Sequence, residues 1–266
     1  AEASGAMDRL LTRTLERLGI QGAGALTASS RWLLERASAR APLRVPAAVI
    51  PAGVDLERFD REAFPDLRAR FGIPEDAVKF FCAGMLGDPR SAALLARLVP
   101  RTLARWERAV FILAGEDPLQ CIPGEILPSL HEGRLAERLF CLGRLAPDQL
   151  RACLAQVDVL VHPSTGESCP RLVLWAMAGS CAIVAPALDS GIPEILRAEV
   201  DGLLAGGAEG YQAAVDRLAA DPGLRRRLGE SARRRAESRF SSRQTALRIE
   251  KAVQVFVHVV RANECA

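Results

Sequence analysis

Residues 161–185 read VHPSTGESCPRLVLWAMAGSCAIVA, and this stretch predicts a strand, a tight loop, a helix and a second strand in succession. Pro163 and Gly166 break the apolar run that precedes them. Pro170 suits a first helical position, where its missing N–H costs nothing. A loop of this kind directs backbone N–H groups and a partial positive charge to one place, which is typical of an anion site, most often for a phosphate. Glu167 lies at the mouth of the loop.

From residue 78 onward, apolar strands alternate regularly with helical stretches. The predicted strands cover residues 78–83, 110–114, 139–142, 157–162, 182–185 and 202–205. The predicted helices cover residues 91–106, 147–155, 171–179, 192–197, 208–220, 222–240 and 241–260. Continuous apolar strands with helices between them predict an α/β fold: a doubly wound, parallel, Rossmann-like sheet covered on both faces. Ligands of such sheets bind at the carboxyl ends of the strands.

The N-terminal part does not follow this alternation. Residues 6–19 predict an amphipathic helix, residues 23–29 a short strand, and residues 31–41 a second helix. Residues 42–46 contain two prolines and interrupt the pattern. We therefore expect two parts, an N-terminal segment of residues 1–46 and a Rossmann-like domain with C-terminal helices in residues 47–266.

The composition places this chain among soluble globular proteins. Of its 266 residues, 49% are hydrophobic and 25% charged, and no apolar run approaches the ~20 residues of a membrane span. A net charge of +3 is too small to indicate a nucleic-acid partner. The first residues lack the apolar centre of a secretory signal but contain arginines, which leaves a removed targeting peptide open.

The cysteines and histidines do not indicate a metal site. No two of the seven cysteines form a C-x-x-C pair, which favours free thiols in a reducing compartment, the cytoplasm or an organelle interior. The three histidines are scattered, so we expect neither a metal nor another cofactor. His162 ends a predicted strand beside the central loop and could face a ligand, although a histidine in that position is more often structural.

The central stretch resembles the donor-binding signature of the family 4 retaining glycosyltransferases, which have the GT-B fold. The family pattern is P-S-x-x-E-[GS]-x-[GP], then a second Glu eight residues after the first, then A-M-A. The chain matches this pattern at Pro163, Ser164, Glu167, Ser168, Pro170, Ala176, Met177 and Ala178. The second Glu is replaced by Trp175. The resemblance implies a single C-terminal, donor-binding GT-B domain whose ligand is a nucleotide diphosphate-sugar.

Residues 48–59 resemble the segment that connects the two domains of this family, with Ala52 in place of an Asn. In the family, this segment leaves an acceptor-binding domain and enters the donor-binding domain. The residues that precede it here are too few for several βα units. The resemblance therefore predicts that residues 1–46 are a remnant and that the acceptor domain is missing from this chain.

The resemblance also implies which residues meet the donor phosphates. The family uses an Arg and a Lys in G-R-L-x-x-x-K-G, and this chain has GMLGDPRS from Gly84 to Ser91. Met85 replaces the Arg, and Arg90 replaces the Lys. Arg90 could pair with a phosphate through two hydrogen bonds, or it could be a solvated loop cation.

The remaining candidates surround the sugar and the nucleoside. Glu167, followed by Ser168, matches the family Glu near the donor sugar, or it is a carboxylate stabilised by a helix N-terminus. Trp175 offers one N–H donor and cannot accept two ribose hydroxyls, so it stacks on the ligand, fills the pocket or packs in the core. Arg144 matches a position whose backbone meets the nucleobase. Glu194 resembles part of a loop near the donor, or is a first-turn helix carboxylate.

Three functions remain open. The missing domain, Met85 and Trp175 favour a degenerate glycosyltransferase-like domain, a structural or interaction subunit with at most weak nucleotide-sugar binding. Glu167 and Arg90 favour the alternative, an active retaining glycosyltransferase half that uses a nucleotide diphosphate-sugar, with the acceptor domain on another chain. A third possibility is a non-catalytic sensor of a nucleotide or nucleotide-sugar.

The last predicted helix indicates a protein partner. Its apolar side consists of Ile249, Ala252, Val253, Phe256, Val259 and Val260, and Val255 and Val257 widen it. A broad apolar surface usually marks a contact site. We expect the chain to pair with itself or with another protein through this helix and residues 6–19, unless the first helix simply packs on the last. Neither a nucleic-acid partner nor a membrane span is expected.

Overall fold

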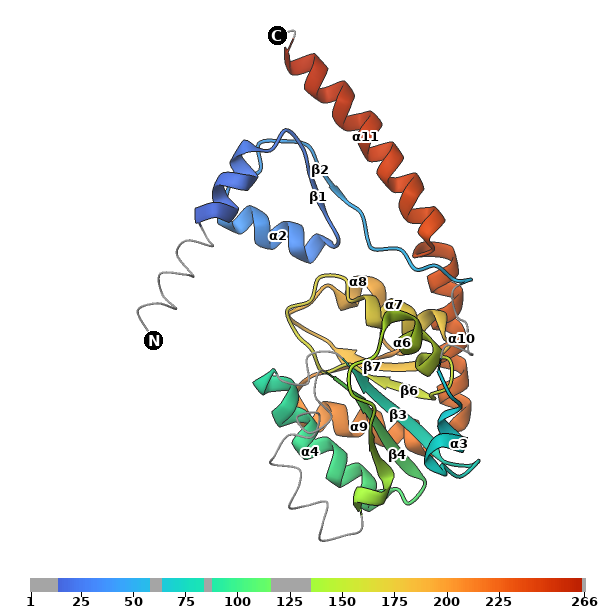
Figure 1. Ribbon diagram of the computed structural model, residues 1–266. Coiled ribbons are helices and arrows are strands. Elements are labelled where there is room, and N and C mark those ends of the chain that lie inside the picture. The colour runs from blue at the N-terminus through green and yellow to red at the C-terminus, as the bar shows by residue number, and fades with distance from the viewer. Residues whose placement is uncertain (1–13, 58–63, 84–87, 116–134, 265–266) are drawn as a thin grey trace. The chain divides into compact units, whose positions relative to one another are not determined.

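The computed structural model describes residues 14–57, 64–83, 88–115 and 135–264, with side chains up to residue 259 (Figure 1). It divides into a smaller unit, Ala1–Gly53 with Ser242–Ala266, and a larger unit, Val54–Ser241. The sequence-based boundary lies at residue 46 and assigns the last helix to the Rossmann-like part, whereas this division groups that helix with the N-terminal segment. Thr245 of the helix donates a hydrogen bond to the Pro51 carbonyl at 3.2 Å, which ties the two segments together.

The larger unit contains a six-stranded parallel sheet. Its strands are β3 (Val78–Ala83), β4 (Ala109–Ala114), β5 (Leu139–Cys141), β6 (Val159–Val161), β7 (Ala182–Pro186) and β8 (Leu203–Ala205). Their order across the sheet is β5-β4-β3-β6-β7-β8. Each strand of the sheet pairs in parallel with its neighbours. The predicted doubly wound parallel fold is therefore confirmed, and the six strands lie where the apolar runs placed them.

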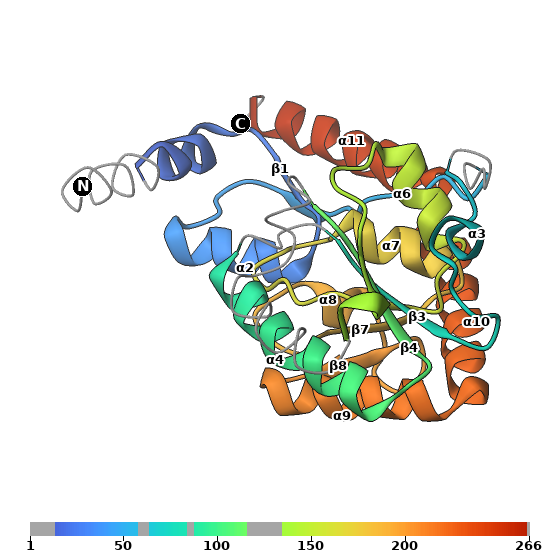
Figure 2. The ribbon, with the colours of Figure 1, turned by 60° about the horizontal axis from the view of Figure 1, so that its bottom comes forward.

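Helices cover both faces of this sheet. They are α3 (Leu67–Phe71), α4 (Pro89–Arg105), the 3₁₀ helix η2 (Leu135–Arg138), α6 (Pro147–Leu154), α7 (Arg171–Ala178), α8 (Ile192–Ile195), α9 (Gly207–Ala220) and α10 (Pro222–Arg239). Helices α4 and α9 lie side by side on one face, and α6 and α7 lie on the other (Figure 2). Helix α10 packs against α7 and β7. The predicted helices of this unit are confirmed, and the short α3 is an addition to them.

The core of the larger unit lies between the sheet and these helices. The rings of Phe80 and Phe111, on neighbouring strands, stack with their centroids 5.1 Å apart. Helices α4 and α10 start at aspartates, since Asp88 and Asp221 accept hydrogen bonds from backbone N–H groups of the first turn. In both helices a proline follows the capping aspartate, as the sequence pattern suggests.

The smaller unit contains a β–α–β segment and a long C-terminal helix. Residues 14–22 are helical, followed by β1 (Leu26–Ala28), α2 (Arg31–Arg40), β2 (Ala47–Val49) and, at the other end of the chain, α11 (Ser242–Glu264). Strands β1 and β2 pair in parallel. Strand β2 occupies residues that the sequence assigned to the interdomain connection. Its three residues are extended because they pair with β1.

Helix α11 exposes much of its apolar surface. The side chains that are 44–52% exposed are Leu247, Ile249, Val253, Val255 and Val257. Ala252 is buried, and Phe256 and Val259 are half-buried. Within the described part of the chain, no helix is both long enough and apolar enough to cross a membrane. The partner surface on α11 stays a prediction.

Candidate functional site

The strand order of the sheet contains one topological switch point, between β3 and β6. From β3 the chain continues outward to β4 and β5, and it then returns to build β6, β7 and β8 on the other side. The connections at the carboxyl ends of β3 and β6 therefore diverge, and ligands of such sheets bind in the crevice between them. Residues 84–87 follow β3 and lie outside the described residues, so the candidates Gly84 and Met85 are not placed. The connection after β6 is described completely.

That connection is a tight loop joined to the loop that follows β7. Gly166 adopts φ +78°, a left-handed conformation that glycine tolerates best. Its N–H donates to the Asp189 carbonyl at 2.7 Å, and the Gly191 N–H donates to the Glu167 carbonyl at 2.9 Å. Two backbone hydrogen bonds thus fix the β6–α7 loop to the loop before α8.

His162 and Glu167 meet inside this loop. The imidazole Nε2 of His162 lies 3.4 Å from Oε1 of Glu167, with the two side chains 3% and 33% exposed. Within the described residues, neither ring nitrogen of His162 has a hydrogen-bond partner of good geometry. Buried polar atoms are rarely left in this state, and the exceptions are often functional.

The electrostatic surroundings keep the Glu167 carboxylate ionised. Burial by itself raises the pKa of Glu167, but the interactions with the His162 and Ser164 side chains outweigh it, so the pKa lies below its usual value of 4.5. Ser164 is buried beside the carboxylate in the same loop. At neutral pH, Glu167 is therefore an acceptor-only group in the loop after β6, on one side of the switch point.

The backbone of His162 is fixed from two directions. Its N–H donates to the Val184 carbonyl of β7 at 2.8 Å. Its carbonyl accepts a hydrogen bond of 2.8 Å from the buried Tyr211 hydroxyl of α9. The histidine is thus held by a neighbouring strand and by a helix on one face of the sheet.

Arg90 lies in the first turn of α4, which follows β3, the strand next to β6. Its side chain is exposed. Asp88 is occupied as the α4 cap, since its Oδ2 accepts from the Ser91 N–H at 2.9 Å and from the Ser91 hydroxyl at 3.0 Å. The aspartate therefore has a structural role, and Arg90 remains a cation on the β3 side of the switch point.

Trp175 lies on α7, eight residues after Glu167, and is half-buried. The guanidinium carbon of Arg151, from α6, lies 5.3 Å from the centroid of its ring, and that of Arg171 lies 6.0 Å away. Both distances are within the range of cation–π contacts. Because Trp175 is partly exposed, it is not a residue of the buried core. The two arginines hold its indole at the surface of α6 and α7.

The other candidates are farther apart. Arg144 is exposed after β5, which lies three strand positions from β6, or roughly 14 Å at the usual spacing. Ser168 is half-buried next to Glu167. Glu194 is exposed on α8, and its backbone carbonyl accepts a hydrogen bond from Arg235 at 3.1 Å. The structure thus brings together Glu167, Ser168 and the loop before α8, but places Arg144 at the sheet edge.

Sequence reasoning left His162 open between a ligand contact and a structural role, and it did not identify Asp189. The available signal for His162 was its position directly after a buried strand, β6. No sequence signal indicated that the Asp189 carbonyl would hold Gly166, because that contact depends on how two loops fold onto each other.

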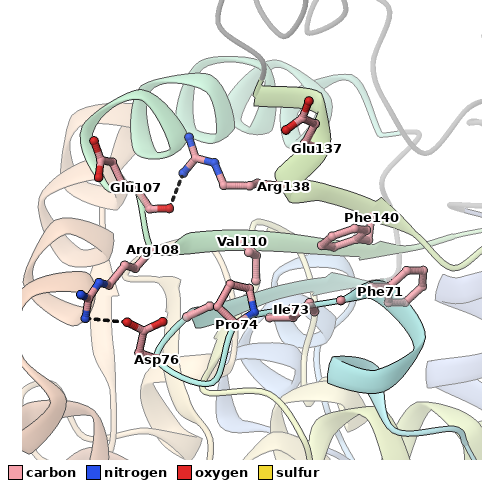
Figure 3. A pocket seen from close by; sticks show the side chains of 12 residues that line it. Phe71, Ile73, Pro74, Asp76, Glu107, Arg108, Val110, Glu137, Arg138 and Phe140 are labelled. Carbon is pink, nitrogen blue, oxygen red and sulfur yellow. Dashed lines mark hydrogen bonds and ion pairs between the residues drawn. The ribbon is translucent and has the colours of Figure 1, made fainter.

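The opposite edge of the sheet carries a shallow pocket of about 130 Å³. It lies before the strands β3, β4 and β5, and Figure 3 shows Phe71 and Phe140 at one end and the Asp76–Arg108 ion pair at the other. Arg138 donates to the carbonyls of Leu103, Trp106, Glu107 and Ala109. Because the two arginines that line it are already engaged, this pocket is a poorer candidate for an anionic ligand than the switch point.

Comparison with known proteins identifies relatives over most of this unit. Residues 77–221 match the family described as glycosyl transferases group 1. Over 204 residues the chain is 31% identical to a D-inositol 3-phosphate glycosyltransferase of Streptomyces bingchenggensis, covering 71% of this chain and 44% of that protein. The chain spans about half the length of the curated relatives it matches first.

Solved structures share the fold. Sucrose-phosphate synthase from Thermosynechococcus elongatus superposes with a TM-score of 0.72 at 22% identity, covering 93% of this chain and 62% of that one. Anabaena Alr3699/HepE in complex with UDP-glucose gives a TM-score of 0.72 at 20% identity, covering 92% of this chain and 68% of that one. At these identities the likeness concerns the fold alone.

Proposed function

Because the chain belongs to the group 1 glycosyl transferases, we propose that its larger unit binds a nucleotide diphosphate-sugar at the β3–β6 switch point. In this proposal it is the donor half of a retaining glycosyltransferase. The observation that carries it is the ionised Glu167 carboxylate, which His162 and Ser164 support at the end of β6. A carboxylate that can only accept hydrogen bonds suits the hydroxyl groups of a sugar.

The start of α7 supports a place for the diphosphate. Helices α2, α4 and α10 each begin at a Ser or Asp side chain that accepts a hydrogen bond from their first turn. In the described structure α7 begins at Pro170 without such a side-chain cap, as do α6, α8 and α9 at their own first residues. Its first N–H groups therefore remain suited to an anion, and this helix starts beside Glu167. Arg90, on the β3 side of the switch point, is a further candidate cation.

Uridine diphosphate is the first nucleotide to test, because HepE shares the fold and was crystallised with UDP-glucose. We do not assign an acceptor. The parallel β1–α2–β2 segment of the smaller unit has the connectivity of a Rossmann-type domain, and we infer that residues 1–46 are part of an acceptor domain. The rest of that domain would be supplied by another chain or by further sequence.

A second candidate is a degenerate donor domain that serves as a structural or interaction subunit. Trp175 favours it, because an indole between Arg151 and Arg171 stands where the family has a ribose-binding Glu. The short N-terminal part does not favour this candidate over the first, since the chain spans only about half the length of its relatives. The exposed apolar side chains of α11 would then serve contact with another protein chain or a second copy.

Thermal unfolding with UDP, GDP, ADP and UDP-glucose separates the two candidates. A ligand at about 100 times its Kd stabilises by about 2.7 kcal/mol, which raises the Tm of a domain this size by several degrees. We expect UDP and UDP-glucose to raise the Tm at micromolar concentration, with the larger effect from UDP-glucose. Glu167→Ala should remove the extra effect of the sugar, and Glu230→Gln, an exposed carboxylate on α10, should not.

Two results of the thermal-unfolding experiment would count against the donor-binding proposal. If no nucleotide raises the Tm even at millimolar concentration, the donor-binding proposal fails. A response that appears only in Trp175→Glu would support the degenerate candidate, because the substitution restores the family carboxylate at that position.

A further inference from the structure

His162 combines burial with incomplete hydrogen bonding. Its side chain is 3% exposed, yet both ring nitrogens lack a hydrogen bond of good geometry to the described residues. A buried polar group without a partner costs free energy, so a histidine that serves packing alone would be readily replaced by an apolar residue. The backbone of His162 is held in place, because its N–H donates to the Val184 carbonyl and its carbonyl accepts from the Tyr211 hydroxyl.

The two ring nitrogens differ in what lies near them. Nε2 is 3.4 Å from the Glu167 carboxylate, whereas Nδ1 has neither a hydrogen bond nor an ion pair with the described residues. A proton on Nδ1 would be an unsatisfied buried donor, and a lone pair there is less costly. Nε2 is therefore the ring nitrogen that presents a proton to the carboxylate.

We propose that His162 is a positioning residue for Glu167: its Nε2–H holds Oε1 of the carboxylate and thereby directs the other oxygen toward a hydroxyl group of the donor sugar. This inference rests on the proposed function. The distance of 3.4 Å is longer than an ordinary N–H···O hydrogen bond, and such contacts often shorten only when the ligand is bound. His162 itself does not touch the donor.

Glu167 needs such support because its side chain is partly exposed. One third of it is open to solvent, and a free glutamate side chain samples several rotamers. The Gly166 turn and the Gly191 hydrogen bond fix only the backbone of the loop. The contact at Oε1, together with Ser164, therefore selects one orientation of the carboxylate, and correct orientation of a site group has a large effect on affinity and rate.

Two substitutions separate this role from simple packing. His162→Gln places an amide N–H near the position of Nε2, whereas His162→Asn places it near Nδ1. Binding of UDP and of UDP-glucose is measured by calorimetry for the wild-type chain and both variants. We expect His162→Asn to weaken UDP-glucose binding about tenfold and to change UDP binding less than about twofold. His162→Gln should restore most of the UDP-glucose affinity.

A ligand-free measurement tests the contact itself. The ring NMR signals of His162 should move in Glu167→Gln, while those of His258 on α11 serve as an unchanged internal reference. Unchanged His162 signals would overturn the proposal, as would equal UDP-glucose affinity in the wild type and His162→Asn. If the wild-type chain binds neither ligand, the proposed function fails and the role toward a donor fails with it, whichever way the His162 signals behave.

Discussion

A basic and an acidic side chain meet at each end of strand β6, and the two pairs are built differently. At the amino end, Lys79 of β3 and Asp158 form a pair in which Asp158 Oδ2 accepts from the Lys79 backbone N–H at 2.8 Å and lies 3.5 Å from its ammonium nitrogen. At the carboxyl end, His162 and Glu167 lie 3.4 Å apart without a well-formed hydrogen bond. Only three residues separate Asp158 from His162.

The two pairs differ in how fully their polar atoms are hydrogen-bonded and paired within the chain. Lys79 is buried and Asp158 supplies it with both a charge and a backbone hydrogen bond, so this pair is complete within the chain. Burial is the main reason that the pKa of Lys79 is lowered, and Asp158 opposes the shift. The pair at the carboxyl end is incomplete and faces the switch point. A complete pair stabilises the fold, and an incomplete pair at the edge proposed to bind the ligand is a candidate for function.

Other polar side chains at the amino edge, where the strands of the sheet begin, also have their partners within the chain. Arg138 uses its guanidinium on four carbonyls near the end of α4, and Arg108 pairs with Asp76 (Figure 3). Cys181, which starts the approach to β7, donates its S–H to the Leu154 carbonyl at 2.9 Å. We therefore expect substitutions at the amino edge to reduce stability and substitutions at the carboxyl edge to reduce ligand binding.

The largest loss of stability is expected from Gly229→Ala at the amino edge. A Cβ at this position of α10 would lie 2.1 Å from the Ser180 carbonyl oxygen, in the turn before β7. Ser180 has φ +59°, so the turn has little freedom to adapt. We expect a loss of about 3 kcal/mol in the free energy of unfolding, measured by urea denaturation.

Gly210→Ala is the matched control, because it is also a helix position. A Cβ there would have its nearest neighbours at 3.8 Å, an ordinary contact. Without a clash, alanine should stabilise α9 by about 0.5–1 kcal/mol. Equal effects of the two substitutions would contradict the close contact between α10 and the Ser180 turn.

The next largest effect is expected from Asp158→Ala. The substitution leaves the buried Lys79 ammonium without its counter-charge and one backbone N–H without an acceptor. We expect a loss of about 2–3 kcal/mol, with UDP binding unchanged. Asp76→Ala at the same edge removes an exposed ion pair and should cost less than about 0.5 kcal/mol. A loss of UDP affinity in folded Asp158→Ala would contradict the idea that the amino edge serves stability and only the carboxyl edge serves ligand binding.

Regular elements of the larger unit were predictable because their signals are local. A strand buried on both faces, such as Val78–Ala83, is a continuous apolar run, and each run is bounded by turn residues. Strand β2 was missed because its three residues lie in a proline-containing segment and become a strand only by pairing with β1, about 20 residues earlier. Helix α3 was missed because five residues give too short a period to recognise.

The candidate site was predictable only as a set of residues. The motif places Glu167 at the loop, but its contact with His162 depends on the left-handed turn at Gly166, which the sequence marks only as a break. Trp175 was open between a ligand pocket and the core, because its neighbour Arg151 lies on another helix, 24 residues earlier. Contacts between distant segments decide both cases, and a single sequence does not contain them.

The smallest change in stability is expected from Glu167→Gln at the carboxyl edge. The pair is partly exposed and lacks a well-formed hydrogen bond, so the substitution should cost less than about 1 kcal/mol at neutral pH. Because the native pKa of Glu167 lies below its usual value of 4.5, the native state favours the ionised form. This stabilisation is complete above the unfolded-state pKa and is lost as the pH falls through the lower native pKa. The urea midpoints of the wild type and Glu167→Gln should therefore converge in acid. UDP-glucose affinity should fall although the fold is kept. A cost at neutral pH as large as that of Asp158→Ala would show that both ends of β6 serve stability alike, and the contrast between the two edges would be lost.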